Sequence, residues 1–205
     1  MANLEHASIP NANLHEPKGV SAAAVNTVYV ADGAGTGTWQ KVAAAQVDSL
    51  TATIAEINSE CDVSARAVNA GATLTIVEAT HAGKLIKLDT AAGSVITLPV
   101  PTGSGAVYVF TVKTLATSNS HIIKVADVNG VFRGVIHTID TDTSDAVASW
   151  GTTSTSDTIT LNRSTTGSVY VGETITITDV ASNVWGVTGF VAVTGTPATP
   201  FSATV

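Results

Sequence analysis

The chain has 205 residues, of which 44% are hydrophobic, 12% charged and 5% aromatic, and its formal net charge is −7. Its nine basic residues are scattered singly, which excludes the cationic cluster that nucleic-acid binding requires. No apolar run approaches the roughly 18 residues of a membrane span, and the first residues lack the cationic and apolar parts of a signal peptide.

The first 26 residues contain no periodic apolar pattern. Leu4, Ile9 and Leu14 are isolated apolar residues, and Pro17 biases the residue before it toward an extended conformation. An extended arm of this length reaches several tens of Å at roughly 3.3 Å per residue, far enough to dock its apolar residues into another protein. A disordered terminus is the alternative.

Two short strands are predicted at residues 27–31 and 39–42, around the Gly-rich connection 32–38. The glycine spacing in this connection matches neither a Walker loop nor a dinucleotide-binding turn, so we interpret it as a plain turn.

Residues 43–68 change to a helical period. A capping box formed by Thr53 and Glu56 predicts a short helix over about residues 54–63. This helix either packs on the rest of the protein or forms a seam about a three-fold axis. The alternating spacings of three and four that mark such a seam connect Val47, Leu50, Ile54, Ile57 and Cys61.

The remainder of the chain is predicted to be mainly β. Turn signals recur every 8–12 residues, which is typical of an antiparallel β-sandwich or a barrel-like domain. The expected strands are 73–78, 84–89, 94–98, 106–113, 121–126, 132–139, 147–150, 157–161, 173–178, 184–187 and 190–194.

The strand at 106–113 is expected to lie centrally in a sheet. Tyr108 and Phe110 fall on one face and Val107 and Val109 on the other, as a period of two requires. Because both faces are apolar, we expect both to be covered.

No catalytic, cofactor or metal site is predicted. The five histidines do not form HxH, HxxxH or HExxH pairs, and the Asp-rich segment 140–145 lacks the central Gly and terminal Glu of a calcium loop. The single Cys61 excludes an intrachain disulfide, and there is no Gly-x-Ser-x-Gly nucleophile motif. Trp150 and Trp185 could form sugar platforms, but packing in a core or interface is favoured.

Several short motifs together resemble virion proteins of tailed bacteriophages, especially capsid-decorating and head-fibre proteins. Residues 9–20 (IPNANLHEPKGV) and 28–40 (VYVADGAGTGTWQ) carry the most specific pieces. The two Gly-x-x-Ile-x-Leu runs at 83–88 and 93–98, with the following Pro-x-Pro-x-Gly-x-Gly-x-x-Tyr-x-Phe, extend the similarity. Segments 157–163, 172–179 and 194–202 carry it through most of the chain.

This resemblance implies a non-catalytic protein on the capsid exterior, assembled in the host cytoplasm. It implies that residues 1–45 form an anchoring arm, while the patterns described above place a helix and linker at 46–71 and a β domain at 72–205. The residues expected to contact the major capsid protein are Leu4, Ile9, Leu14, Pro17 and Trp39. Those expected in a homotrimer interface are Leu50, Ile54, Ile57 and Cys61.

The alternative is a tail-associated fibre or receptor-binding protein that contacts host-surface glycan. Exposed aromatic residues at the end of the β domain far from the N-terminus would favour this alternative.

Overall fold

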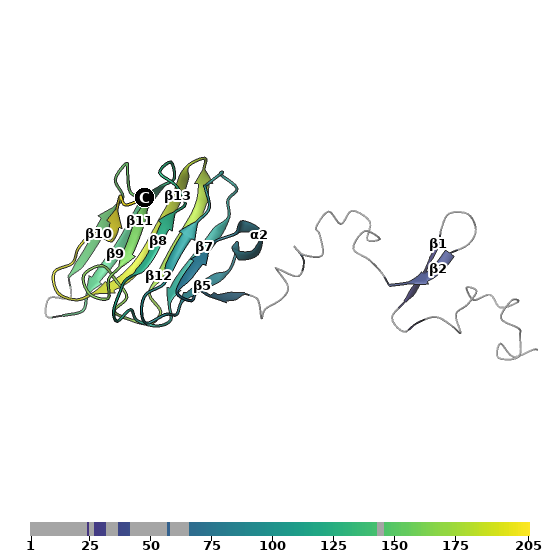
Figure 1. Ribbon diagram of the computed structural model, residues 1–205, viewed down its shortest axis with the longest axis horizontal. Helices are drawn as coiled ribbons and strands as arrows, with labels where there is room; N and C mark the ends of the chain where they lie inside the picture. The colour runs from purple at the N-terminus through teal and green to yellow at the C-terminus, as the bar shows by residue number, and fades with distance from the viewer. Residues whose placement is uncertain (1–23, 25–26, 32–36, 42–56, 58–65, 143–145) are drawn as a thin grey trace, which may run out of the picture. The chain divides into compact units, whose positions relative to one another are not determined.

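The computed structural model describes residues 24, 27–31, 37–41, 57, 66–142 and 146–205. The chain divides into two units, residues 1–58 and 59–205 (Figure 1). In the first unit, β1 (Val28–Ala31) and β2 (Gly37–Gln40) form an antiparallel hairpin, which confirms the two strands predicted there. The rings of Tyr29 and Trp39 meet edge to face across it, with centroids 5.5 Å apart.

The second unit consists of two β-sheets. The larger has the order β10-β9-β13-β12-β7-β5-β3 and the smaller the order β14-β11-β8-β6-β4. The strands of the larger sheet are β3 (Ala67–Asn69), β5 (Leu85–Leu88), β7 (Val107–Val112), β9 (Val131–Asp140), β10 (Val147–Gly151), β12 (Thr174–Ala181) and β13 (Val184–Val193). Those of the smaller sheet are β4 (Thr73–Thr75), β6 (Val95–Leu98), β8 (His121–Val125), β11 (Thr158–Leu161) and β14 (Phe201–Ser202).

The mainly β prediction is confirmed, but the pairing is mixed instead of purely antiparallel. From β3 to β8 the chain alternates between the two sheets, so strands two apart in sequence become parallel neighbours. The first six strands of this unit therefore wind as a coil. The later strands add antiparallel pairs to both sheets, apart from the parallel pair formed by β13 and β9.

A single turn of helix, α2 (Glu78–His81), interrupts the segment where the strand 73–78 was expected to continue. The Val77 N–H donates to His81 Nδ1 over 2.8 Å and closes this turn. The helix predicted over residues 54–63 lies outside the described residues except for Ile57, which is helical. Within the described part of the chain, no helix is long and apolar enough to cross a membrane.

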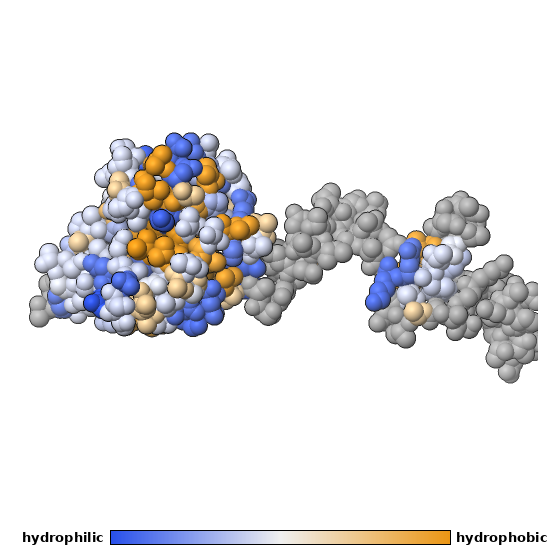
Figure 2. All heavy atoms as spheres, viewed as in Figure 1, coloured by the Kyte–Doolittle hydropathy of each residue, from blue (hydrophilic) through white to orange (hydrophobic). Residues whose placement is uncertain are grey.

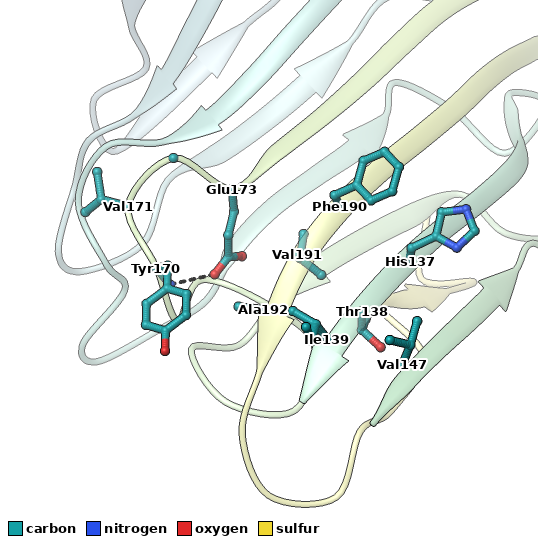
Figure 3. Close-up of a pocket in the computed structure, with 11 residues that line it drawn as sticks. His137, Thr138, Ile139, Val147, Tyr170, Val171, Glu173, Phe190, Val191 and Ala192 are labelled. Carbon is teal, nitrogen blue, oxygen red and sulfur yellow. Dashed lines mark hydrogen bonds between the residues drawn. The ribbon is translucent and has the colours of Figure 1, made fainter. Parts of the chain in front are cut away.

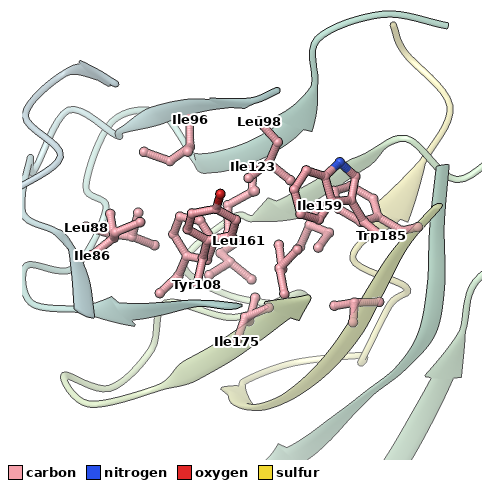
Figure 4. Packing of buried hydrophobic residues seen from close by; sticks show 14 of the residues in the cluster. Ile86, Leu88, Ile96, Leu98, Tyr108, Ile123, Ile159, Leu161, Ile175 and Trp185 are labelled. Atoms are coloured by element: carbon pink, nitrogen blue, oxygen red, sulfur yellow. The ribbon is translucent and has the colours of Figure 1, made fainter. Parts of the chain in front are cut away.

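The core fills the space between the two sheets (Figure 4). Tyr108 and Trp185 meet edge to face at 5.8 Å, and neither the Tyr108 hydroxyl nor the Trp185 indole N–H has a hydrogen-bond partner among the described residues. Burial, with the Glu78 and Asp179 carboxylates adding to it, raises the pKa of Tyr108 to about 12. The fully buried aliphatic side chains around them include Ile86, Leu88, Ile96, Leu98, Ile123 and Ile159.

Strand β7 is interior to the larger sheet, as predicted, but only one of its faces is covered. Tyr108, Phe110 and Val112 are buried, whereas Val107 is exposed and Val109 half-buried on the opposite face. The prediction that both faces are covered is therefore wrong within the described unit, because no second layer packs on the outward side of this sheet there.

The turn between β6 and β7 is fastened to β12 by Asp179. This carboxylate accepts hydrogen bonds from the Thr102 N–H and hydroxyl, the Gly103 N–H and the Ser104 hydroxyl, at 2.9, 3.1, 2.7 and 3.0 Å. Burial opposes ionisation of Asp179, but these hydrogen bonds outweigh it and lower the pKa of the carboxyl.

Candidate functional site

An open hollow of about 520 Å³ lies where β9, β10 and β13 meet the loop before β12 (Figure 3). In the larger sheet this end, marked by β10, is opposite the end formed by β3. The side chains around the hollow are almost all apolar, and include Ile139, Val147, Tyr170, Val171, Phe190 and Ala192.

The rim of the hollow carries large apolar side chains that face solvent. Val147 is 71% exposed, Phe190 68% and Tyr170 56%. Single exposed apolar residues are ordinary on a soluble protein, but several around one concavity mark a contact surface. Figure 2 shows that hydrophobic residues gather on the face of this unit that is turned to the viewer.

A row of two polar residues and one aromatic residue crosses three strands beside the hollow. The strand register places Ser149, His137 and Phe190 at neighbouring positions on β10, β9 and β13. The His137 ring stacks on Phe190 with centroids 5.2 Å apart, and its Nδ1 lies 2.8 Å from Ser149 Oγ.

This Ser–His contact does not form a catalytic constellation. A serine nucleophile requires a base that a third group orients and donors that stabilise an oxyanion. Among the described residues, no hydrogen bond from the His137 ring to a carboxylate is found, and the Phe190 ring stacks on the imidazole. The pair lies on an open sheet surface.

The nearest carboxylate to the hollow, Glu173, holds the loop that forms its wall. It accepts hydrogen bonds of 2.6 Å from the backbone N–H groups of Ser168, Val169 and Tyr170. Burial raises the pKa of Glu173, while these hydrogen bonds act in the opposite direction. Because the carboxylate is committed to the loop, it is a positioning group for Tyr170 and not a free acid or base.

The described residues contain no cluster of three or more His, Cys, Asp and Glu side chains that could hold a metal ion. The acidic segment at 140–142 makes turn hydrogen bonds instead. Asp140 accepts from the Asp142 N–H at 3.2 Å, and Asp142 accepts from the Gly195 N–H at 3.0 Å. The chemistry that the hollow offers is the burial of apolar groups.

The predicted contact residues are placed only in part. Trp39 is half-buried on β2, against Tyr29. Ile57 is the one predicted interface residue that the structure describes. The other predicted residues lie outside the described residues: Leu4, Ile9, Leu14, Pro17, Leu50, Ile54 and Cys61.

Both tryptophans considered as sugar platforms take part in packing. Trp185 is buried between the sheets, and Trp150 packs against the core with its indole N–H 3.2 Å from Thr138 Oγ1. The preference for packing over a platform is confirmed for both.

Sequence reasoning missed the residues of the hollow. Phe190 lies on β13 between the buried residues Gly189 and Val191. Its side chain therefore points outward only because of the register of β13 in the sheet. Tyr170 and Val171 belong to a loop with no periodic pattern. The sequence does show an aromatic residue, Phe190, between Thr188 and Ala192. It can be recognised as an outward residue only when the side of β13 that faces the core is known.

A comparison with protein-family models finds no match for this chain, and a comparison with curated proteins finds no significant relative.

Proposed function

We propose that this chain is a structural protein of a tailed-bacteriophage virion that binds the outside of the capsid as a decoration, cement or head-fibre protein. Support comes from the motifs at 9–20, 28–40 and 83–113, and from a charged fraction of 12% against the usual quarter or so. The observation that carries the proposal is the exposed apolar surface around the hollow, because it marks the β domain as one that assembles with other protein surfaces.

In this proposal the protein acts by binding without turnover. The arm lays Leu4, Ile9, Leu14 and Pro17, together with the Trp39 hairpin, across the major capsid protein. Buried apolar area contributes about 25 cal/mol per Å², less the cost of ordering the arm, so binding stabilises the assembled shell over free subunits.

A homotrimer would strengthen this attachment. A seam made by Leu50, Ile54, Ile57 and Cys61 closes about a three-fold axis and presents three arms together. Weak anchors that are linked in this way bind with an avidity well above that of one arm. No membrane or nucleic-acid partner is part of the proposal.

The test is reconstitution on purified capsids followed by cryo-electron microscopy, with the full chain, a chain lacking residues 1–45, and the paired variants Trp39→Ala and Lys41→Ala. We expect density at three-fold or quasi-three-fold positions for the full chain and its loss on truncation. Trp39→Ala should weaken binding, while Lys41→Ala, which alters an exposed neighbour, should not. Density confined to the tail, or none on any particle, would refute the proposal.

One observation favours the tail-fibre alternative. The exposed Tyr170 and Phe190 lie at the β10 end of the larger sheet, opposite the β3 end by which the chain enters this unit. Aromatic rings that face solvent can stack on the apolar faces of sugars. Saturable binding of a host-surface polysaccharide that is abolished by Phe190→Ala would support this alternative, and equal binding by wild type and variant would remove it.

A further inference from the structure

Among the described residues, the outward positions of the strands of the larger sheet carry no carboxylate. Its outward positions are those that alternate with the buried core residues of β5, β7, β9, β10, β12 and β13. One row of neighbouring outward positions across five strands consists of Val135, Thr188, Thr176, Val109 and Leu85. The only charged residues at outward positions of these six strands are Lys87 and Arg133.

This distribution is unusual in a chain with 16 acidic residues and a net charge of −7. Two copies of such a protein repel each other overall, but contact through the outward positions of these strands brings no strand carboxylates together. The Arg133 guanidinium is also occupied, because it donates to the carbonyl oxygens of Phe132, Thr153 and Ser154. The strands of this face therefore add no carboxylate repulsion to a contact between two copies, and Arg133 and Lys87 are their only outward charges.

The same face carries both a projecting side chain and a hollow. Phe190 is 68% exposed on β13, and the hollow beside it has a volume of about 520 Å³ and apolar walls. In Figure 3 Phe190 lies above the group formed by Ile139, Val147 and Tyr170. A two-fold contact uses the same patch on both copies, so a projection beside a cavity becomes complementary to itself.

The area of the face approaches that of a standard dimer interface. Seven strands about 4.8 Å apart, each contributing about six residues at roughly 3.3 Å, cover on the order of 600 Å² in plan. Side-chain relief raises the accessible area toward the roughly 800 Å² per partner of a standard interface. Apolar and Thr side chains on facing sheets can interdigitate about 10 Å apart, as they do within a β-sandwich.

We propose that two copies of this chain pack through the outward faces of their larger sheets about a two-fold axis, with Phe190 of each copy entering the hollow of the other. This contact is separate from the three-fold seam and does not depend on the virion role. A seam alone gives three copies, the sheet contact alone gives two, and both together give six.

A second copy fits this surface better than a glycan. Sugar hydroxyls need polar partners, but the Glu173 carboxylate is held by three backbone N–H groups and the Thr138 hydroxyl by Trp150. The walls that remain are hydrocarbon and aromatic, apart from the His137 ring and the Tyr170 hydroxyl. Such walls favour apolar side chains from another protein surface.

The experiment is sedimentation equilibrium of the full chain over a wide concentration range, in a background of Ile54→Ser and Ile57→Ser that disables the seam. We expect a dimer of about 41 kDa, twice the 20.7 kDa of one chain. Adding Val147→Glu, or separately Phe190→Ser, should weaken dimerisation by about 100-fold or more, because each dimer loses the truncated contact twice. The matched control is Val128→Glu, which changes a valine that is 73% exposed, against 71% for Val147, and that lies in the loop between β8 and β9 and does not line the hollow.

A cooperative unfolding transition in every variant shows that loss of the dimer is not loss of the fold. Amides of β9, β10 and β13 should also exchange more slowly as concentration rises. The proposal is overturned if the background protein stays monomeric at all concentrations, or if Val147→Glu and Val128→Glu have the same effect. Protection of the hollow by a saccharide without dimerisation would also overturn it, in favour of a glycan.

Discussion

Replacing Asp179 by Asn tests how the turn between β6 and β7 is held. The carboxylate accepts four hydrogen bonds from Thr102, Gly103 and Ser104, and the residue is 2% exposed. An amide of the same shape can accept on one side only, so at least one of these donors loses its partner on residue 179. The donors belong to exposed residues that water can reach, so the loss is that of the hydrogen bond itself, which contributes about 1.5–3 kcal/mol when the acceptor is charged. We therefore expect Asp179→Asn to lower the free energy of unfolding by about 2 kcal/mol.

The pH dependence of this loss has a definite sign. The pKa of Asp179 is lowered from its ordinary value of 3.8, so the folded state binds fewer protons than the unfolded state in that range. The stabilisation is fully present above the unfolded pKa and is lost as pH falls through the folded pKa. The difference in stability between wild type and Asp179→Asn should stay constant near neutral pH and shrink below about pH 4.

Urea denaturation followed by tryptophan fluorescence measures this difference, with an unchanged m value as the check on cooperativity. Asp127→Asn is the matched control, because Asp127 caps an exposed turn with one hydrogen bond of 2.8 Å to the Asn129 N–H. We expect the control to change stability by less than about 1 kcal/mol. Equal effects of the two substitutions, or a difference that does not shrink in acid, would contradict the assigned role of Asp179.

Three further predictions concern the core and are measured by the same denaturation assay. Gly134→Ala should cost at least about 3 kcal/mol or prevent folding, because its Cβ would lie 1.8 Å from the Val187 carbonyl oxygen at a φ of 148°, while Gly151→Ala, with open space around it, should be nearly neutral. Burial lowers the pKa of His121, so as pH falls below about 6.5 wild type should lose more stability than His121→Gln; parallel pH profiles would refute this. Tyr108→Phe removes a buried hydroxyl that has no partner among the described residues and should change stability by less than about 0.5 kcal/mol; a loss above about 1 kcal/mol would show that the hydroxyl is bonded.

The positions of most strands follow from the sequence because one face of each is buried and the period of two is visible. The clearest error is β13, which was expected as two strands broken around Thr188 and Gly189. It continues from Val184 to Val193, and at Gly189 the absence of a side chain leaves room for Ile175 and Ile136, which an added Cβ would meet at 3.1 and 3.3 Å. Strands β3 and β14, of three and two residues, are too short to show a period.

Unlike strand positions, the parallel or antiparallel direction of neighbouring strands could not be predicted from the sequence. Parallel and antiparallel strands share the same period, so the alternation of Ile86 and Leu88 with outward residues fits either pairing. The coil from β3 to β8 arises because each short connection carries the chain to the opposite sheet. That choice depends on packing between distant segments, not on a local pattern.

The hollow was beyond sequence reasoning because its walls come from three strands and a loop. Val147, Ile139 and Phe190 meet only through the pairing of β10 with β9 and of β9 with β13. Tyr170 reaches the hollow because Glu173 fixes the loop by hydrogen bonds to three backbone N–H groups. Glu173 itself was expected only as the first residue of a strand.

The failed prediction that both faces of β7 are covered is also informative. The apolar outward residues Val107 and Val109 led us to expect a layer on both faces of β7, and the described unit supplies a layer on one face only. A strand that is apolar on both faces is costly to leave open to water, since exposed apolar area loses about 25 cal/mol per Å² of stabilisation. The low charge of the whole chain indicates hidden surface independently of the fold. Both observations are accounted for if the missing layer is supplied by another molecule, so the outward side chains of β7 and β13 carry information about assembly instead of about the fold of the single chain.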